Sequence, residues 1–257
     1  MSGVHPMAVV AAGATLGAEV EIGPFVYVGP HVTLGDGVRI MPHAFLDGWT
    51  TLGAGCTVFP FASLGAQTQD LKFQGGRTAV EIGAGTTLRE AVTVHAATAE
   101  GGVTRIGAGC HIMAYVHVAH DCQLGDRVII SNATQLAGHV TIEDDAGLSG
   151  ACGVPQFVRI GRMAYVGGMT KVVQDVPPYM LCDGCPAALR APNTVGLQRH
   201  NLTATAQAAL RKAYKLLCRD GLNTTQALAR MRAELPACDE IEHLIRFIET
   251  SERGILK

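Results

Sequence analysis

The stretch IGAGCHIMAYVHVAHDCQLGDRVII, residues 106–130, has an aliphatic residue at every sixth position. The same period covers most of the chain, with two interruptions that preserve its phase. Its members are Val4, Val10, Leu16, Ile22, Val28, Leu34, Ile40, Leu46, Leu52, Val58, Leu64, Ile82, Leu88, Val94, Ile106, Ile112, Val118, Leu124, Ile130, Leu136, Ile142, Leu148, Val154, Ile160, Val166 and Val172. A hexapeptide period is typical of a parallel β-helix, whose three flat sides give a coil of about 18 residues.

The other positions of the hexapeptide agree with this fold. Counted from the aliphatic residue, the fifth position is small or β-branched, as the inside of a narrow prism requires. The second position is often glycine, which indicates tight corners. Four cysteines occupy the inward fifth position: Cys56, Cys110, Cys122 and Cys152. Buried, reduced thiols favour a cytoplasmic protein.

Composition limits the possible functions. The 257 residues allow one or two domains, and a net charge of −2 gives no reason to expect a nucleic-acid partner. The start, MSGVHPMAVV, lacks the features of a signal peptide, and no apolar run is long enough for a transmembrane segment. Cys182 and Cys185 form a CxxC, but no second pair completes a zinc site, so we interpret them as unrelated thiols.

The two interruptions and a change of period divide the chain. We expect the β-helix to cover residues 1–178, with loops ejected at about 67–80 (QTQDLKFQGGRTAV) and 100–105 (EGGVTR). The first loop concentrates charged residues, so we expect it to contribute to a binding face. Val176-Pro177-Pro178 is predicted to close the solenoid, because prolines cannot donate to a β-ladder.

Residues 179–257 are predicted to form a connector followed by helices. Apolar residues share one helical face in three segments, which are Leu210 to Leu217, Leu228 to Leu235 and Ile241 to Ile248. Thr203 or Thr205 is a candidate N-cap of the first helix. The fold class is therefore an all-β solenoid plus α, with helices that pack against the solenoid or another subunit.

The coil length of about 18 residues predicts which residues lie together in a candidate site. His120, Gly138 and Gln156 occupy third positions in successive coils, so they should stack at one corner. If a hexapeptide is looped out below, His95 becomes a neighbour of His120 on the outer surface. His120-Asp121 is suited to general-base catalysis, and the Gly138 N–H could stabilise an oxyanion. The alternative is a set of hydrogen-bonded surface histidines without catalytic function.

Several motifs resemble those of the acyl-ACP:UDP-N-acetylglucosamine O-acyltransferases. They are GPFVYVGPHV at 23–32, the NQDLK-like segment 67–72, HVAHDC at 117–122, ATQLAGHV at 133–140, QDVPPY at 174–179, AYKLL at 213–217 and SERGI at 251–255. The resemblance spans essentially the whole chain and implies a left-handed β-helix and a homotrimer with active sites between subunits. It also implies acyl carrier protein as acyl donor, UDP-GlcNAc or its 3-amino analogue as acceptor, the first step of lipid A synthesis, and no metal or cofactor.

The resemblance also assigns roles to individual positions. His120 matches the base that deprotonates the sugar 3-hydroxyl, Asp121 its orienting partner, and Gly138 the oxyanion donor. The matching substrate contacts are Asp70 and Lys72 for the sugar, His95, His117, His139 and Gln156 for further contacts, and Asn193 and Arg199 for the nucleotide. Gly168 matches the position that limits the depth of the acyl chain. The chain departs from the family pattern at Pro155, Val195 and His200.

Two other functions remain open from the sequence. One is the N-acyltransferase that acts later in the same pathway, although that relative usually has an additional N-terminal domain and here the repeat begins by Val4. The other is a zinc enzyme of the γ-carbonic-anhydrase kind, which requires three converging histidines. His95, His117 and His120 are the candidates for that metal site.

Overall fold

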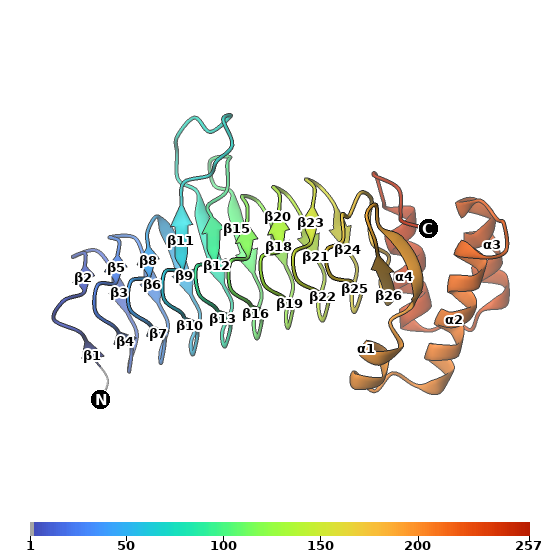
Figure 1. Ribbon diagram of the computed structural model, residues 1–257, viewed down its shortest axis with the longest axis horizontal. Coiled ribbons are helices and arrows are strands. Elements are labelled where there is room, and N and C mark those ends of the chain that lie inside the picture. Colours follow the sequence, from blue (N-terminus) through green and yellow to red (C-terminus); the bar gives the residue numbers. More distant parts are fainter. Residues whose placement is uncertain (1–2) are drawn as a thin grey trace.

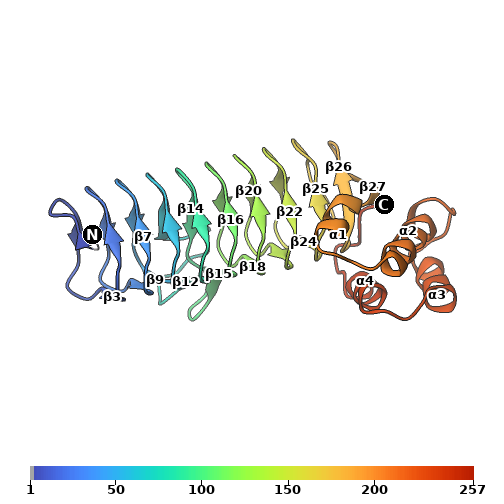
Figure 2. The ribbon, with the colours of Figure 1, turned by 90° about the horizontal axis from the view of Figure 1, so that it is seen from below.

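The computed structural model describes residues 3–257, and these form a long three-sided prism with helices at one end (Figure 1). Its sides are sheets of eleven, eight and eight strands, parallel except for β27, and from β1 to β25 consecutive strands of the chain belong to different sheets. Seen from below, the coils stack as separate rungs along the axis (Figure 2). None of the helices within residues 3–257 combines the length and apolarity that a membrane crossing needs.

Each sheet takes one short strand from every coil. The longest sheet contains β1 (Gly3–Val4), β4 (Glu21–Ile22), β7 (Arg39–Ile40), β10 (Thr57–Val58), β13 (Thr87–Leu88), β16 (His111–Ile112), β19 (Ile129–Ile130), β22 (Gly147–Leu148), β25 (Tyr165–Val166), β26 (Met180–Asp183) and β27 (Ala188–Pro192). The second contains β2 (Val9–Val10), β5 (Tyr27–Val28), β8 (Phe45–Leu46), β11 (Ser63–Ala66), β14 (Thr93–His95), β17 (His117–Val118), β20 (Gln135–Leu136) and β23 (Gly153–Val154). The third contains β3 (Thr15–Leu16), β6 (Thr33–Leu34), β9 (Trp49–Leu52), β12 (Ala79–Ile82), β15 (Val103–Ile106), β18 (Gln123–Leu124), β21 (Thr141–Ile142) and β24 (Arg159–Ile160).

The strand register confirms the period and both interruptions. Arg39 pairs with Thr57, Thr57 with Thr87, and Thr87 with His111. The coil is therefore longer by two hexapeptides at the first interruption and by one at the second, while the aliphatic positions keep their phase. From Ile22 onward these aliphatic side chains are almost completely buried and form one continuous core.

The loop boundaries differ from the predicted ones. The first loop covers 67–78, because Ala79 and Val80 already belong to β12. The second covers 96–102 rather than 100–105, because Val103 to Arg105 pair with Ala79 to Glu81. Thr104 occupies an inward position and is completely buried. The ladder therefore extends three residues further toward the N-terminus of β15 than the aliphatic positions alone indicate.

The second-position glycines were expected to form tight corners, but the structure requires them for a different reason. Positive φ angles occur at the fourth position of the hexapeptides, and most of those residues are not glycine, for example Phe25, Asp121 and His139. The second-position glycines are instead required by the close approach of successive coils. At Gly35, an added Cβ would lie 2.6 Å from the Ala54 nitrogen.

The inward cysteine side chains connect neighbouring coils. Cys56, Cys110 and Cys152 donate from Sγ to the carbonyl oxygens of Gly83, Gly125 and Gly167, at 3.0 to 3.2 Å. Cys122 likewise donates to Ala137 O at 3.2 Å. Each thiol therefore satisfies a corner carbonyl of the next coil.

The prolines do not close the solenoid as predicted. After Pro177 and Pro178 the chain forms β26, which continues the longest sheet in parallel with β25 and pairs with the antiparallel β27. The prolines precede the first residue of β26, so no ladder donor is lost.

Four helices cover this end of the solenoid. They are α1 (Thr194–Arg199), α2 (Ala204–Cys218), α3 (Thr224–Glu234) and α4 (Asp239–Glu249). Thr203 caps α2 as predicted, accepting from Ala206 N, whereas α1 lies within the segment expected to be a connector. The guanidinium of Arg159 lies 4.2 Å from the ring centroid of Phe247 and Tyr214 Oη donates to Arg190 O, so the helices pack on the solenoid.

Candidate active site

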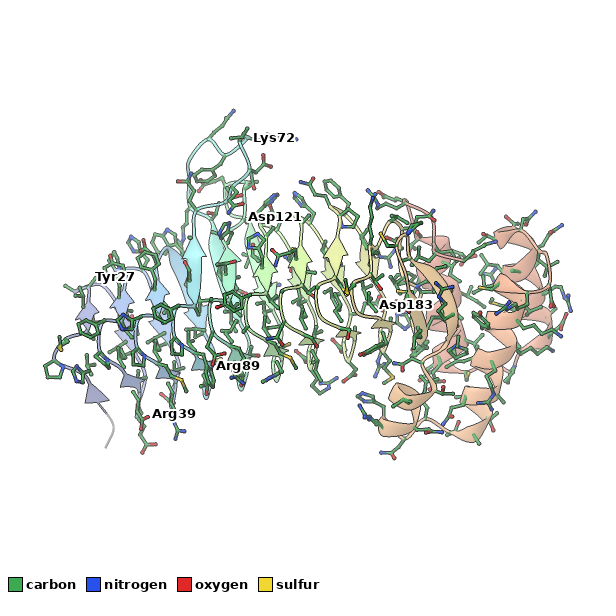
Figure 3. The ribbon with its side chains drawn as sticks, in the orientation of Figure 1. Tyr27, Arg39, Lys72, Arg89, Asp121 and Asp183 are labelled. Carbon is green, nitrogen blue, oxygen red and sulfur yellow. The ribbon has the colours of Figure 1, made fainter. Side chains whose placement is uncertain are left out.

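A groove of about 1020 Å³ runs across β14, β17, β20 and β23, below the first loop. Figure 3 shows Lys72 on this raised loop and Asp121 near its base. The groove brings together seven of the predicted site residues, which are Asp70, Lys72, His95, His117, His120, Gly138 and Gln156. The 18-residue step therefore correctly predicted that His120, Gly138 and Gln156 lie near one another.

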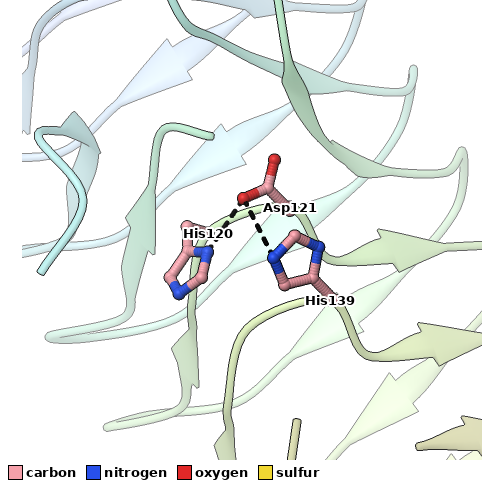
Figure 4. A group of neighbouring side chains, drawn as sticks. All are labelled: His120, Asp121 and His139. Atoms are coloured by element: carbon pink, nitrogen blue, oxygen red, sulfur yellow. Dashed lines mark hydrogen bonds and ion pairs between the residues drawn. The ribbon is translucent and has the colours of Figure 1, made fainter. Parts of the chain in front are cut away.

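His120 and Asp121 form a close polar pair. Nδ1 of His120 lies 2.8 Å from Oδ2 of Asp121 (Figure 4). A carboxylate can only accept, so Nδ1 carries the proton in this bond and Nε2 keeps a lone pair. His120 is only 6% exposed, although its corner position predicted an outward surface residue. Gly138 and His139 pack against the ring, and the second loop holds the adjacent Asp121, which together account for the difference.

The second loop fixes Asp121. Thr98 N donates to Oδ2 at 3.1 Å, and Asp121 N donates to Thr104 Oγ1 at 2.8 Å. The Thr98 hydroxyl also lies 3.2 Å from that of Thr68, so both ejected loops are joined beside the acid. Thr98 could not be predicted from the sequence, because it acts through its backbone N–H and nothing in the residue type signals that contact.

Gly138 lies directly against His120. An added Cβ would overlap Cε1 and Nε2 of the ring and would lie 2.9 Å from Nδ1, so this position has no room for a side chain. Gly138 is buried and lines the groove. Within residues 3–257 its N–H donates to no protein acceptor, so the donor is available to a ligand.

His95 and His117 form the wall beside this pair. Their ring centroids are 4.8 Å apart in an edge-to-face arrangement, and His117 Nδ1 lies 2.7 Å from Thr93 Oγ1. Burial, and then the neighbouring His95 and His120, lower the pKa of His117 from 6.5 to about 4. Burial, followed by His120, also lowers the pKa of His95. Both rings are therefore neutral hydrogen-bonding groups near pH 7.

The low pKa of His117 predicts acid sensitivity of the fold. Between pH 6.5 and about 4 the unfolded chain binds a proton at His117 that the folded chain does not bind. Stability should therefore fall as the pH decreases through this window and lose nothing more from this group below it. We expect His117→Gln, which can still bond Thr93, to flatten this part of the profile. Urea melts of both proteins at several pH values would check this, and parallel profiles would contradict it.

Asp70 has a structural contact as well as a place in the groove. Its Oδ1 accepts from Lys72 N at 2.9 Å, and its own N–H donates to Thr68 Oγ1 at 3.1 Å. Asp70 therefore shapes the turn that presents Lys72. The neighbouring Leu71 is fully exposed at 101%.

Five predicted site residues do not line the groove, and Asp121, which bonds His120 from outside it, is one of them. His139 lies behind Asp121, with Nε2 3.6 Å from Oδ2, and stacks on Phe157. Asn193 is buried, caps α1 and donates to Met163 O. Arg199 is exposed in the last turn of α1, and Gly168 is exposed at another corner, where an added Cβ would lie 3.7 Å from Gly150 O.

The three histidines of the zinc alternative line one groove, but their ring nitrogens do not converge closely enough to bind one metal ion. Within residues 3–257, the side chains whose possible ligand atoms converge within 4.8 Å are His120, Asp121 and His139, not His95, His117 and His120. The shortest contact in this set joins His120 and Asp121, which is the arrangement of a proton-transfer pair.

The groove is also lined by two cations outside the predicted catalytic and substrate-binding residues. Lys171 and Arg253 line the end opposite the first loop. Lys171 lies one coil from Gly153, so the 18-residue step could have found it. Arg253 comes from the C-terminal tail, whose path over the solenoid has no periodic signal.

Comparisons with known proteins find relatives that match nearly the whole chain. The family model described as "Udp N-acetylglucosamine O-acyltransferase; Domain 2" matches residues 175–256, and the bacterial transferase hexapeptide model matches 13–48 and 104–138. A protein of Anaeromyxobacter dehalogenans strain 2CP-1, named acyl-(acyl-carrier-protein)–UDP-N-acetylglucosamine O-acyltransferase, is 50% identical, with 99% of each chain covered. A protein of the same name from Paraburkholderia phymatum is 46% identical, with both chains fully covered.

Solved structures extend the likeness to the fold. The UDP-N-acetylglucosamine acyltransferase of Bacteroides fragilis superposes with a TM-score of 0.97 at 39% identity, covering 99% of this chain and 100% of that one. The Acinetobacter baumannii structure gives a TM-score of 0.95 at 36% identity, with 99% of each chain covered. The predicted left-handed parallel β-helix with a C-terminal helical domain is confirmed. The chain belongs to the family of acyl-(acyl-carrier-protein)–UDP-N-acetylglucosamine O-acyltransferases.

Proposed function

We propose that this protein transfers a 3-hydroxyacyl chain from acyl carrier protein to the 3-position of UDP-GlcNAc, or of its 3-amino analogue, in the first step of lipid A synthesis. The observation that carries the proposal is the His120–Asp121 pair packed against Gly138 in a groove, in a chain of this family. A transfer assay with both sugar nucleotides and acyl carrier proteins of several chain lengths tests it. Absence of transfer to either acceptor would refute it.

The geometry provides a base and an oxyanion donor. With Nδ1–H directed at Asp121, Nε2 of His120 takes the proton of the acceptor hydroxyl or amine. The acceptor atom then bonds to the thioester carbon, and the N–H of Gly138 stabilises the oxyanion that forms. The carbon–sulfur bond breaks, and the imidazolium returns the proton to the departing thiolate. Asp121 stabilises the imidazolium between these two steps.

The other groove residues are suited to holding the acceptor. Asp70 and Lys72 on the loop, together with His95 and His117, provide polar groups at one end of the groove. Because both histidines are neutral near pH 7, they can hydrogen-bond sugar hydroxyls without adding charge. Gln156 lies beyond Gly138, toward the other end. Binding energy from these groove residues would align the two substrates, and the proposed reaction requires neither a metal nor a cofactor.

We propose further that the protein works as a homotrimer with sites between subunits. Exposed apolar side chains follow one corner of the solenoid, at Phe61, Tyr115 and Met169, with exposures of 63%, 67% and 80%. Leu71 projects from the loop in the same unpartnered way. Apolar surface of this extent is typical of protein interfaces. In a trimer Asn193, Arg199 and Gly168 of a neighbour would reach a groove that they cannot reach in their own chain.

Mixed trimers would test this arrangement. In the proposed site, His120 comes from one subunit and Arg199 from its neighbour. His120→Ala and Arg199→Ala therefore damage opposite sides of each shared site. Coexpressed with separate tags, they should regain up to about one quarter of wild-type activity, because random mixing restores that share of the interfaces. Each variant mixed with itself is the control. Recovery no greater than the sum of the two variants would contradict a site shared between subunits.

A further inference from the structure

The end of the groove opposite the first loop has an uncompensated positive charge. Lys171 and Arg253 line it, and the single acidic residue among the lining residues is Asp70, which lies on the loop at the other end. Within residues 3–257 neither Lys171 nor Arg253 forms an ion pair. The chain as a whole carries a net charge of −2. An anionic ligand would therefore find its counter-charge at this end.

Arg253 is held at this position by a buried carboxylate. Asp175 is 1% exposed, and its side chain accepts from Ser251 Oγ at 2.7 Å and from Arg159 N at 2.9 Å. Its backbone bonds Gly254 O and Leu256 N on the other side of the arginine. The tail is thus fixed on both sides of Arg253, which makes the cation part of the groove wall.

The strand register gives the distance of Lys171 from the proposed reacting centre at Gly138. Gln135 pairs with Gly153, and Gly153 pairs with Lys171. Lys171 therefore lies two strand steps beyond the coil of Gly138, or about 10 Å along the axis. Apolar side chains, among them Val154, Pro155 and Val172, line the groove between the two points.

The direction of the reaction points to the acyl donor as the source of the anion. In the proposed mechanism the attacking oxygen lies at His120, on the loop side, and the thioester carbonyl lies at Gly138, one coil further on. The sulfur stays within reach of the His120 imidazolium that protonates it, and the prosthetic arm continues from the sulfur past Gly138, away from the loop. That arm is an amide chain that ends in a phosphodiester to the carrier protein. The apolar stretch followed by two cations is complementary to it.

We propose that Lys171 and Arg253 bind the phosphate that joins the acyl-bearing arm to its carrier protein, and so determine specificity for the donor. The inference rests on the proposed function and assigns a donor contact to residues on the opposite side of the reacting centre from the loop. The UDP diphosphate offers the same chemistry, and kinetics with both substrates separate the two sources.

The test compares two small donors that differ by one phosphate, acyl-pantetheine and acyl-4′-phosphopantetheine. Wild-type kcat/KM should favour the phosphorylated donor about tenfold or more, and less so at high salt. Lys171→Met with Arg253→Met should bring the ratio near one, without changing KM for UDP-GlcNAc or kcat/KM for acyl-pantetheine. Lys171→Arg should keep the ratio, and Arg39→Met, an exposed cation in an N-terminal coil, serves as the control.

The outcomes are distinct. A wild-type ratio retained in the double variant would overturn the inference, and so would a rise confined to the KM for UDP-GlcNAc, which would assign the cations to the diphosphate. Wild-type protein that transfers no acyl group even from acyl carrier protein would instead refute the proposed function. Melting curves of the variants should match the wild type, because both side chains are exposed.

Discussion

Replacement of His120 by alanine should lower kcat by about 10²- to 10⁴-fold, the usual contribution of a positioned general base. No other group in the groove has the same combination of a carboxylate partner and a position against Gly138. The fold should persist, because Asp121 keeps its bonds to Thr98 N and Thr104 Oγ1. Single-turnover rates and thermal melts measure the two effects separately.

His5→Ala provides a matched control, since His5 is an exposed histidine in the first coil. It should retain full activity. A loss of only a few-fold in His120→Ala would remove His120 from the role of base. A collapse of the melting temperature would show that its packing in the site matters more than its chemistry.

Gly138→Ala should have an effect of similar size for a steric reason. The added methyl group occupies the space of the His120 ring, so the ring must turn away from Asp121. The N–H at position 138 is chemically unchanged, so the loss reports mainly on the displaced base. Gly3→Ala is the control, because a Cβ there meets nothing within 4 Å and Gly3 lies outside the groove. A crystal structure of each variant would show the position of the ring.

The two substitutions can be combined to identify the cause. If Gly138→Ala acts through His120, it should add little to His120→Ala, and the double variant should resemble the single ones. Multiplicative losses would instead indicate that residue 138 acts independently on the oxyanion. Full activity in Gly138→Ala would refute the proposed packing of the site.

The solenoid could be predicted from the sequence because the pattern of inward residues recurs in every coil. Each inward residue appears again one coil later, so the period, the register and the His120, Gly138 and Gln156 column follow from spacing alone. The loop boundaries were less accurate, because β15 extends the ladder through Val103 to Arg105, where the aliphatic period has no member. A repeat pattern marks where its own residues lie and how long each irregular coil is, but it leaves the boundary between strand and loop within that coil undetermined.

Contacts that depend on nonperiodic segments could not be predicted. The burial of His120 depends in part on the second loop, whose backbone, rather than a side chain, holds Asp121. The position of Arg253 depends on Asp175 and the path of the tail. Neither contact leaves a spacing in the sequence, because the partners are joined by tertiary packing.

The thiols that bond corner carbonyls make the core chemically inert. Burial raises the pKa of Cys110 to about 11 and that of Cys122 to about 12, so neither forms the thiolate that oxidants and alkylating reagents attack. Cys182 is similarly buried, with a pKa raised to about 12, whereas Cys185 is exposed. Gly184 and Ala187, on either side of Cys185, bond the backbone of Lys171. A maleimide fluorophore should therefore react first at Cys185, ahead of the half-buried Cys218 and Cys238, whose pKa values burial raises. Its emission beside the proposed donor end of the groove could follow the arrival of the carrier protein without an engineered cysteine.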